Sequence, residues 1–194
     1  MKVIMATGNM DKVREIRQIL EGSDIEILSM KDAGIDADIE ETGSSFEENA
    51  AIKAQYIRDL TGHITIADDS GLEIDYLDGA PGIYSSRFMG EDTSYDQKNA
   101  AILEKLADVP DEKRGARFVC AMAIAYPSGE TKVVKGVMEG RIAWEIAGSE
   151  GFGYDPIFYL PERGCTSAQL TPEQKNAISH RGQALRKAVE LLKG

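Results

Sequence analysis

Two consecutive carboxylates, Asp68 and Asp69, stand between apolar residues in the segment 66–72. Carboxylate oxygens bind hard cations, and a bound cation can orient or activate a water molecule. Asp and Ser side chains are also common in turns, where they satisfy backbone donors. The pair therefore has two interpretations: a metal and water site at the end of a strand that faces a cleft, or an ordinary turn.

A second pair of carboxylates, Glu40 and Glu41, lies in the acidic stretch 31–43. Either glutamate can supply a further metal ligand, although a solvated run of charge is the simpler interpretation of these two residues alone. The chain has only two histidines, His63 and His180, so any metal ion should be held by carboxylates. Such ligands favour magnesium or manganese.

A lysine stands on the apolar side of a predicted helix that begins at Ser45. At about 100° per residue, Lys53 falls near the centre of the apolar stripe, and Asn49 lies at its border. An ammonium group on such a stripe costs desolvation free energy unless a partner or a cavity receives it. Either Lys53 faces a ligand, or its stem packs while its ammonium reaches water. The stripe consists of Phe46, Ala50, Ala54 and Ile57.

The segment Thr7-Gly8-Asn9-Met10-Asp11-Lys12 joins a predicted strand to a predicted helix. Free backbone N–H groups at the start of a helix form a ready phosphate site. A cation such as Lys12 is mildly unfavourable at this end of a helix, which points to an anionic ligand. The glycine spacing is not that of a Walker loop. The alternative is a capped turn that carries a surface lysine.

A glycine-rich segment, 148–156, lets the backbone approach a ligand closely. Within it, Phe152 and Tyr154 flank Gly153 and offer flat apolar faces for a base, and Asp155 offers a hydrogen-bond acceptor. Many turns have a similar composition, so the glycines alone are weak support for a binding site.

Three basic residues, Lys175, His180 and Arg181, lie within seven positions of one another near the predicted start of the last helix at Ser179. Cations in a first helical turn are electrostatically misplaced unless they meet an anion or the acceptor edge of a base. In an acidic protein, this cluster favours a functional role over a structural one.

The composition excludes several classes of protein. The 194 residues carry 22 Lys and Arg against 33 Asp and Glu, a formal net charge of −11, which argues against a nucleic-acid or anionic-membrane partner. The longest apolar run, 118–126, is far shorter than the ~18 residues of a membrane span. The N-terminus becomes polar too early for a signal peptide. We interpret Cys120 and Cys165 as free thiols. Because free thiols are typical of a reducing compartment, we expect a cytoplasmic protein.

Hydrophobic periodicity predicts an α/β fold, with a mixed β-sheet core flanked by helices. A hairpin of two long strands supplies antiparallel pairs, and the loops at strand ends should line a cleft. Helices are predicted over about 10–20, 45–60 and 95–107 and from 179, with a capped segment from 171. Strands are predicted over 2–6, 25–28, 64–67, 72–77, 116–126, 131–138 and near 157–160.

Taken together and in order, these segments resemble the inosine triphosphate pyrophosphatase family, and the bacterial members most closely. The resemblance covers almost the whole chain. The matching stretches are Ala6-Thr7-Gly8-Asn9 with Lys12, Glu41-Thr42-Gly43, Phe46-Glu47-Glu48-Asn49-Ala50 with Lys53, Ala67-Asp68-Asp69-Ser70-Gly71-Leu72, Gly79-Ala80-Pro81-Gly82-Ile83-Tyr84-Ser85, Gly151-Phe152-Gly153-Tyr154-Asp155-Pro156 and Ser179-His180-Arg181-Gly182.

The resemblance implies a single nucleoside triphosphate pyrophosphatase domain over 1–194, with two lobes around a deep nucleotide-binding cleft, and a homodimer. It further implies magnesium-dependent cleavage of ITP, dITP and XTP between the α- and β-phosphates. The products are a nucleoside monophosphate and pyrophosphate, and the reaction cleanses the nucleotide pool. A non-catalytic nucleotide sensor and a hydrolase of modified pyrimidine nucleotides are the alternatives.

Site residues follow from the matching motifs. Asp69 matches the proton acceptor and metal ligand, and Glu41 is the expected second ligand, with Glu40 as the alternative. Lys53 is expected to act in catalysis by reaching phosphate. Substrate binding is expected from two sets of residues: Thr7, Gly8, Asn9, Met10, Asp11 and Lys12 on phosphate, and Ser70, Phe152, Gly153, Tyr154, Asp155, Lys175, His180 and Arg181 around the nucleotide.

Overall fold

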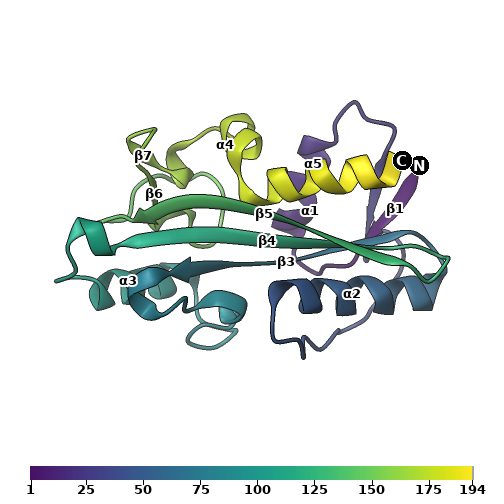
Figure 1. Ribbon diagram of the computed structural model, residues 1–194, viewed down its shortest axis with the longest axis horizontal. Coiled ribbons are helices and arrows are strands. Elements are labelled where there is room, and N and C mark those ends of the chain that lie inside the picture. Colours follow the sequence, from purple (N-terminus) through teal and green to yellow (C-terminus); the bar gives the residue numbers. More distant parts are fainter. Residues whose placement is uncertain (194) are drawn as a thin grey trace. The chain divides into compact units, whose positions relative to one another are not determined.

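The computed structural model describes residues 1–193, which contain a seven-stranded sheet in the order β2-β1-β3-β4-β5-β6-β7 (Figure 1). Strand β1 pairs in parallel with β2 and β3, whereas β6 pairs antiparallel with β5 and β7. The α/β class with a mixed sheet is therefore confirmed. The strands are Lys2–Met5 (β1), Glu26–Ser29 (β2), Thr65–Ile74 (β3), Gly115–Ala125 (β4), Thr131–Ile142 (β5), Phe158–Leu160 (β6) and Cys165–Thr166 (β7).

Helices flank the strands at most of the predicted places. They are Met10–Ile19 (α1), Phe46–Thr61 (α2), Tyr95–Lys105 (α3), Pro172–Ile178 (α4) and His180–Lys193 (α5). Helix α2 begins after Ser45, as predicted, and the Ser45 hydroxyl accepts from the Glu48 N–H, while the Glu48 carboxylate accepts from Ser44.

The chain divides into two compact units. Unit 1 contains Met1–Ser70, Cys120–Gly136 and the chain from His180 onward, and unit 2 contains Gly71–Val119 and Val137–Ser179. The predicted single domain over 1–194 includes residue 194, which lies outside the described residues, so its extent stays a prediction. The predicted cleft stays a prediction as well.

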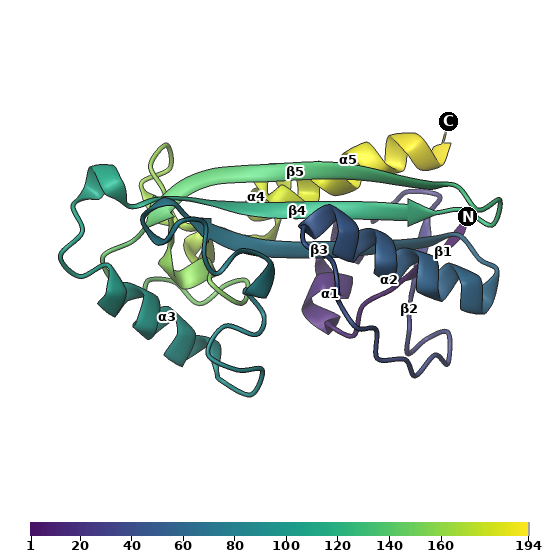
Figure 2. The same ribbon diagram turned by 60° about the horizontal axis from the view of Figure 1, so that its bottom comes forward.

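In unit 1, α1 and α5 share one apolar core with β1, β2 and the unit 1 parts of β3 and β4. Ile16 of α1 and Leu185 of α5 are fully buried there, as their periodicity predicts. Helix α2 lies on the opposite side of the strands from α5 in both views (Figures 1 and 2). A Cβ atom at Gly136 of β5 would lie 2.1 Å from the backbone oxygen of His180, so this glycine allows α5 to approach the sheet.

Unit 2 has its own core, built from α3, β6 and the unit 2 parts of β3, β4 and β5. Phe118 and Phe158 pack together in it, with their ring centroids 4.4 Å apart and their planes tilted by 39°. The glycine-rich segment is held against this core by Tyr154, whose hydroxyl donates to the Ser85 backbone oxygen at 2.6 Å.

One sequence prediction is wrong. Strands over 64–67 and 72–77 flanking 68–71 were expected, with the two acids either at a strand end or in a turn, but β3 runs unbroken through Asp68, Asp69, Ser70 and Gly71. The carboxylates do not need a turn, because cationic side chains inside the protein compensate their charge, as described below. Two smaller differences are that β5 extends four residues beyond the predicted end at 138 and that β7 was not predicted.

Candidate functional site

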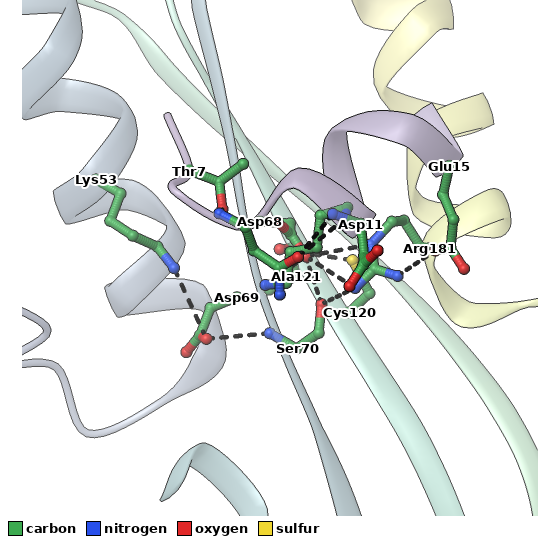
Figure 3. Close-up of polar contacts among 12 residues, drawn as sticks. Thr7, Asp11, Glu15, Lys53, Asp68, Asp69, Ser70, Cys120, Ala121 and Arg181 are labelled. Atoms are coloured by element: carbon green, nitrogen blue, oxygen red, sulfur yellow. Dashed lines mark hydrogen bonds and ion pairs between the residues drawn. The ribbon is translucent and has the colours of Figure 1, made fainter. Parts of the chain in front are cut away.

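Neighbouring side chains on a strand point to opposite faces, and β3 uses this to give its two carboxylates different partners. Asp68 contacts Lys12 of α1 and Arg181 of α5, whereas Asp69 contacts Asn49 and Lys53 of α2. Figure 3 shows Asp68 beside Arg181 and Asp69 turned towards Lys53. The consecutive acids that sequence analysis singled out are therefore two separate centres, one on each face of the strand.

Asp68 is the most buried of these carboxylates, with none of its surface exposed. Its Oδ2 lies 3.0 Å from the Lys12 ammonium and 3.3 Å from Nη2 of Arg181, and it accepts the Ser70 hydroxyl at 2.6 Å. Burial alone would raise the pKa of Asp68, but Lys12 and Arg181 outweigh it and hold that pKa well below its usual range. Asp68 is therefore a permanent anion that fixes two cations.

Asp69 has a different electrostatic character. Its Oδ2 accepts the Asn49 side-chain amide at 3.1 Å and its Oδ1 accepts the Ser70 backbone N–H at 3.0 Å, while the Lys53 ammonium stands 3.8 Å from Oδ1. Burial raises the pKa of Asp69 above its usual value and outweighs Lys53, which favours the charged form. A raised pKa brings a carboxylate closer to the range in which it can accept a proton usefully.

Lys53 is buried on the apolar stripe, as predicted, and its ammonium meets a carboxylate. It donates to Oε1 of Glu41 at 2.6 Å, and the Lys53 and Glu41 side chains are 11% and 19% exposed. Burial lowers the pKa of Lys53, but Asp69, Asp68 and Glu41 together raise it above its usual value, so the group stays charged. Glu40 is exposed, which favours Glu41 as the glutamate of the site.

The phosphate-loop prediction needs one adjustment. Asn9 caps α1, and its side-chain oxygen accepts the backbone N–H groups of Asp11 and Lys12 at 2.9 and 3.3 Å. These two N–H groups were expected to be free for phosphate, and the cap already uses them. Thr7 accepts the Asn9 N–H through its hydroxyl at 3.1 Å.

The remaining residues of this loop differ in exposure. Gly8 and Met10 are exposed, and Asp11 forms an ion pair with Arg14 at 2.7 Å. Lys12 is the loop residue that the structure brings to the carboxylates of β3, since its side chain is only 15% exposed and its ammonium lies on Asp68.

A second group of predicted residues lies in unit 2. The Lys175 ammonium donates to Oδ2 of Asp155 at 2.6 Å and stands 5.0 Å over the Phe152 ring. Oδ2 also accepts the Phe152 backbone N–H, and Oδ1 accepts the Ser167 hydroxyl at 2.7 Å. A Cβ atom at Gly151 would lie 2.2 Å from Asp155 Oδ2, so a glycine is required where the loop closes on this carboxylate.

Gly153 and Tyr154 of the same loop were predicted to bind the nucleotide, with Tyr154 and Phe152 offering flat apolar faces for a base. Tyr154 is buried, its ring makes an edge contact with Tyr95 at a centroid distance of 5.2 Å, and Gly153 has a positive φ of 68°. Their contact with a base stays a prediction, as it does for His180, which is buried in unit 1 at the start of α5.

The sequence analysis missed three residues that hold predicted ones in place. Asn49 bridges the Gly43 N–H and Asp69, Glu15 binds Arg181, and Ser167 binds Asp155. Two of them had a signal in the sequence. Asn49 stands one helical turn before Lys53, and Glu15 stands three residues after Lys12 on the same side of α1. Ser167 had none, because no periodicity or motif in the sequence links it to Asp155.

No group of three or more His, Cys, Asp or Glu side chains within residues 1–193 is arranged to hold a metal ion. The carboxylates of Glu41 and Asp69 are nevertheless suitable ligands for magnesium, because they offer only oxygen atoms. Both lie near the Lys53 ammonium, at 2.6 and 3.8 Å. Magnesium in phosphate-processing sites is commonly held by one or two carboxylates, with water and substrate phosphate completing its shell.

A cavity of about 400 Å³ lies elsewhere in unit 2. Its walls include Arg141, Trp144 and Tyr159, and none of the predicted site residues lines it. In the part of the chain that the structure describes, no helix is long and apolar enough to cross a membrane.

Residues 3–191 match the model of the Ham1 family. A protein of Exiguobacterium sibiricum named dITP/XTP pyrophosphatase is 53% identical over 96% of this chain and 94% of its own length. One of Clostridium perfringens with the same name is 47% identical over 100% and 98%. The solved structure of a HAM1 protein from Coxiella burnetii has a TM-score of 0.89 at 41% identity, covering 100% of this chain and 98% of that one. These matches confirm the resemblance drawn from the sequence motifs.

Proposed function

Because this chain belongs to the Ham1 family, we propose that it hydrolyses the non-standard purine nucleoside triphosphates ITP, dITP and XTP to nucleoside monophosphate and pyrophosphate. The cluster of Asp69, Lys53 and Glu41 carries the proposal, since it combines a buried carboxylate of raised pKa with a charged lysine. The dITP/XTP pyrophosphatase name of the relatives at about half identity supports the same substrates.

In the proposed reaction, Asp69 orients a water molecule and takes its proton as the water attacks the α-phosphorus. The Asn49 amide donates to one Asp69 oxygen and so fixes the direction of the other. Lys53 and Lys12 stabilise the negative charge that develops on the departing pyrophosphate. For Lys12, this role requires phosphate to share the ammonium with Asp68.

We propose magnesium as the cofactor, with manganese as a substitute, and Glu41 and Asp69 as the residues that hold it. When bound, the ion supplies charge neutralisation and polarisation of the phosphate oxygens. Removal of divalent ions with EDTA should abolish turnover, and added Mg²⁺ should restore it. Turnover that persists in EDTA would exclude a metal requirement.

We assign base selection to Arg181 and its neighbour His180. Hypoxanthine and xanthine carry a 6-oxo acceptor where adenine carries an amino donor, and a guanidinium group has only donors. Arg181 would therefore pair with the 6-oxo group and disfavour adenine. Ser70, Phe152, Gly153, Tyr154, Asp155, Lys175 and His180 stay predicted contacts of the nucleotide.

The experiment that tests the function is pyrophosphate release from a panel of ITP, dITP, XTP, ATP, dUTP and a methylated dTTP. We expect turnover of the first three and little of the others, and nearly none in Asp69→Asn. Asp24→Asn, an exposed carboxylate on the surface, is the matched control. Binding of ITP without turnover would favour a nucleotide sensor, and a preference for the pyrimidine nucleotides would favour the other alternative.

We also propose that the protein is a cytoplasmic homodimer without nucleic-acid or membrane partners. The free thiols of Cys120 and Cys165 support a reducing, cytoplasmic environment. The net charge of −11 argues against nucleic-acid and anionic-membrane partners. The homodimer rests on the family resemblance alone. Light scattering after size-exclusion chromatography should give twice the chain mass, and a single chain mass would contradict it.

A further inference from the structure

Arg181 lies between two buried carboxylates that come from different elements. Glu15 of α1 accepts from its Nη1 at 2.5 Å, and Asp68 of β3 accepts from its Nε and Nη2 at 3.4 and 3.3 Å (Figure 3). The side chains of Arg181, Glu15 and Asp68 are 3%, 8% and 0% exposed. The two acids thus hold different nitrogens of one planar guanidinium group.

Glu15 adds a second carboxylate to the buried charges beside Arg181. Asp68 is shared, because the Lys12 ammonium and the Arg181 guanidinium both lie on its Oδ2. Without Glu15, these two cations would rely on one carboxylate in a buried setting where an uncompensated charge is costly. Glu15 makes the set two cations and two anions.

Holding nitrogens on opposite sides of a guanidinium group also fixes its orientation. Asp68 contacts Nε and Nη2 on one edge of the guanidinium group, and Glu15 contacts Nη1 on the other. With both edges held, the guanidinium plane cannot rotate freely. In this orientation Nη2 also lies 3.4 Å from the Ser70 hydroxyl. A donor pattern can select a base only if its direction is fixed before the base arrives.

We propose that Glu15 is a positioning residue for Arg181: it orients the guanidinium for nucleotide recognition and couples α5 to α1, the helix that carries Lys12. This inference rests on the proposed function, since it assigns a role to Glu15 in the same site. Glu15 itself acts through Arg181 and does not touch the substrate.

The test is Glu15→Gln, which keeps the shape and an acceptor oxygen but removes the charge. A hydrogen bond to a charged group contributes about 1.5–3 kcal/mol, so we expect kcat/KM for dITP to fall roughly 10–150-fold. The ratio of kcat/KM for dITP to that for dATP should fall with it. Glu21→Gln, on an exposed glutamate just beyond α1, should leave both values unchanged.

A double-mutant cycle with Arg181→Lys separates positioning from a merely structural role. If Glu15 acts through Arg181, Glu15→Gln should add little further loss of kcat/KM in the Arg181→Lys background. Multiplicative losses, or a lower melting temperature with wild-type kcat/KM for dITP, would overturn the proposal. Should Glu15→Gln not fold, Glu15→Asp, which keeps the charge on a side chain one methylene shorter, enters the same cycle.

A spectroscopic measurement keeps the inference separate from the proposed function. In protein labelled with ¹⁵N-arginine, the Nη1–H signal of Arg181, the nitrogen that donates to Glu15, is assigned by its loss in Arg181→Lys and should be protected from solvent exchange. The signal should lose this protection in Glu15→Gln, and an unchanged signal would overturn the inference. Absence of pyrophosphate release by the wild-type protein would overturn the proposed function only.

Discussion

Replacing Lys53 with methionine tests whether the ammonium between Glu41 and Asp69 is an electrostatic partner. The apolar stripe alone predicts that methionine would be tolerated, since it packs without a charge. The ion pair with Glu41 at 2.6 Å reverses this expectation, because the substitution leaves two mostly buried carboxylates without their cation.

The magnitude follows from the burial of the pair. Removing one partner of a buried ion pair costs about 3–5 kcal/mol, whereas exposed pairs contribute roughly 0–1 kcal/mol. With Lys53 11% and Glu41 19% exposed, we expect Lys53→Met to lower the free energy of unfolding by about 2 kcal/mol. At roughly 2–4 °C per kcal/mol for a chain of this size, the melting temperature should fall by about 4–8 °C.

The assay is thermal unfolding of Lys53→Met, Glu41→Gln and the double variant, each with and without Mg²⁺. The double variant should recover more than half of the loss, because no glutamate charge is left without its partner. Added Mg²⁺ should stabilise Lys53→Met more than the wild type, since Glu41 and Asp69 are no longer occupied by the ammonium. The KM for dITP should also rise in Lys53→Met.

Two results would refute this reasoning. One is a melting temperature of Lys53→Met equal to or above that of the wild type. The other is a loss that Glu41→Gln does not relieve, which would mean that Lys53 stabilises the protein through its packed stem.

Three further predictions concern other groups. Asp69→Asn should lower kcat roughly 10²–10⁴-fold in the pyrophosphate-release assay without unfolding the protein, and wild-type turnover would refute its role as base. Arg181→Ala should lower kcat/KM for ITP more than for ATP, whereas equal losses would indicate that Arg181 binds phosphate. Phe152→Ala should lower kcat/KM for both substrates evenly, because stacking depends little on base identity. Ser29 and Arg17 lower the pKa of Asp32 from 3.8 to about 2, so its stabilising contribution is present above the unfolded value and is lost as the pH falls from about 4 towards 2. In urea unfolding, Asp32→Asn should therefore be less sensitive to acid over that range than the wild type, and equal sensitivity would contradict the assignment.

Sequence reasoning found the residues with unusual settings for their chemistry. Lys53 was noticeable because a charge stood on an apolar stripe, and Lys12 because a cation stood at the start of a helix. Lys12 is buried against Asp68 of β3, and Lys53 is buried against Glu41 of the loop before α2. In each case the local pattern was unfavourable unless a partner existed, which is why the pattern was informative.

The same reasoning could not find partners that are distant in the sequence. The acids of 68–69 suggested a turn because their cations come from α1, α2 and α5, and only the folded chain shows that a strand can bury them. Glu15 resembles a surface residue of an amphipathic helix until Arg181, 166 positions later, is placed beside it.

The opposite directions of Asp68 and Asp69 have a consequence for how β3 finds its place during folding. Its residues from Thr65 to Asp69 are all buried, so hydrophobic alternation does not distinguish one face of the strand from the other. A pairing displaced by one residue would turn every side chain to the wrong face. It would also place Ser70 or Asp68 where Lys53 requires Asp69. The two acids therefore select the strand register, and sequences with an apolar residue at either position should be prone to misregistered, aggregating intermediates.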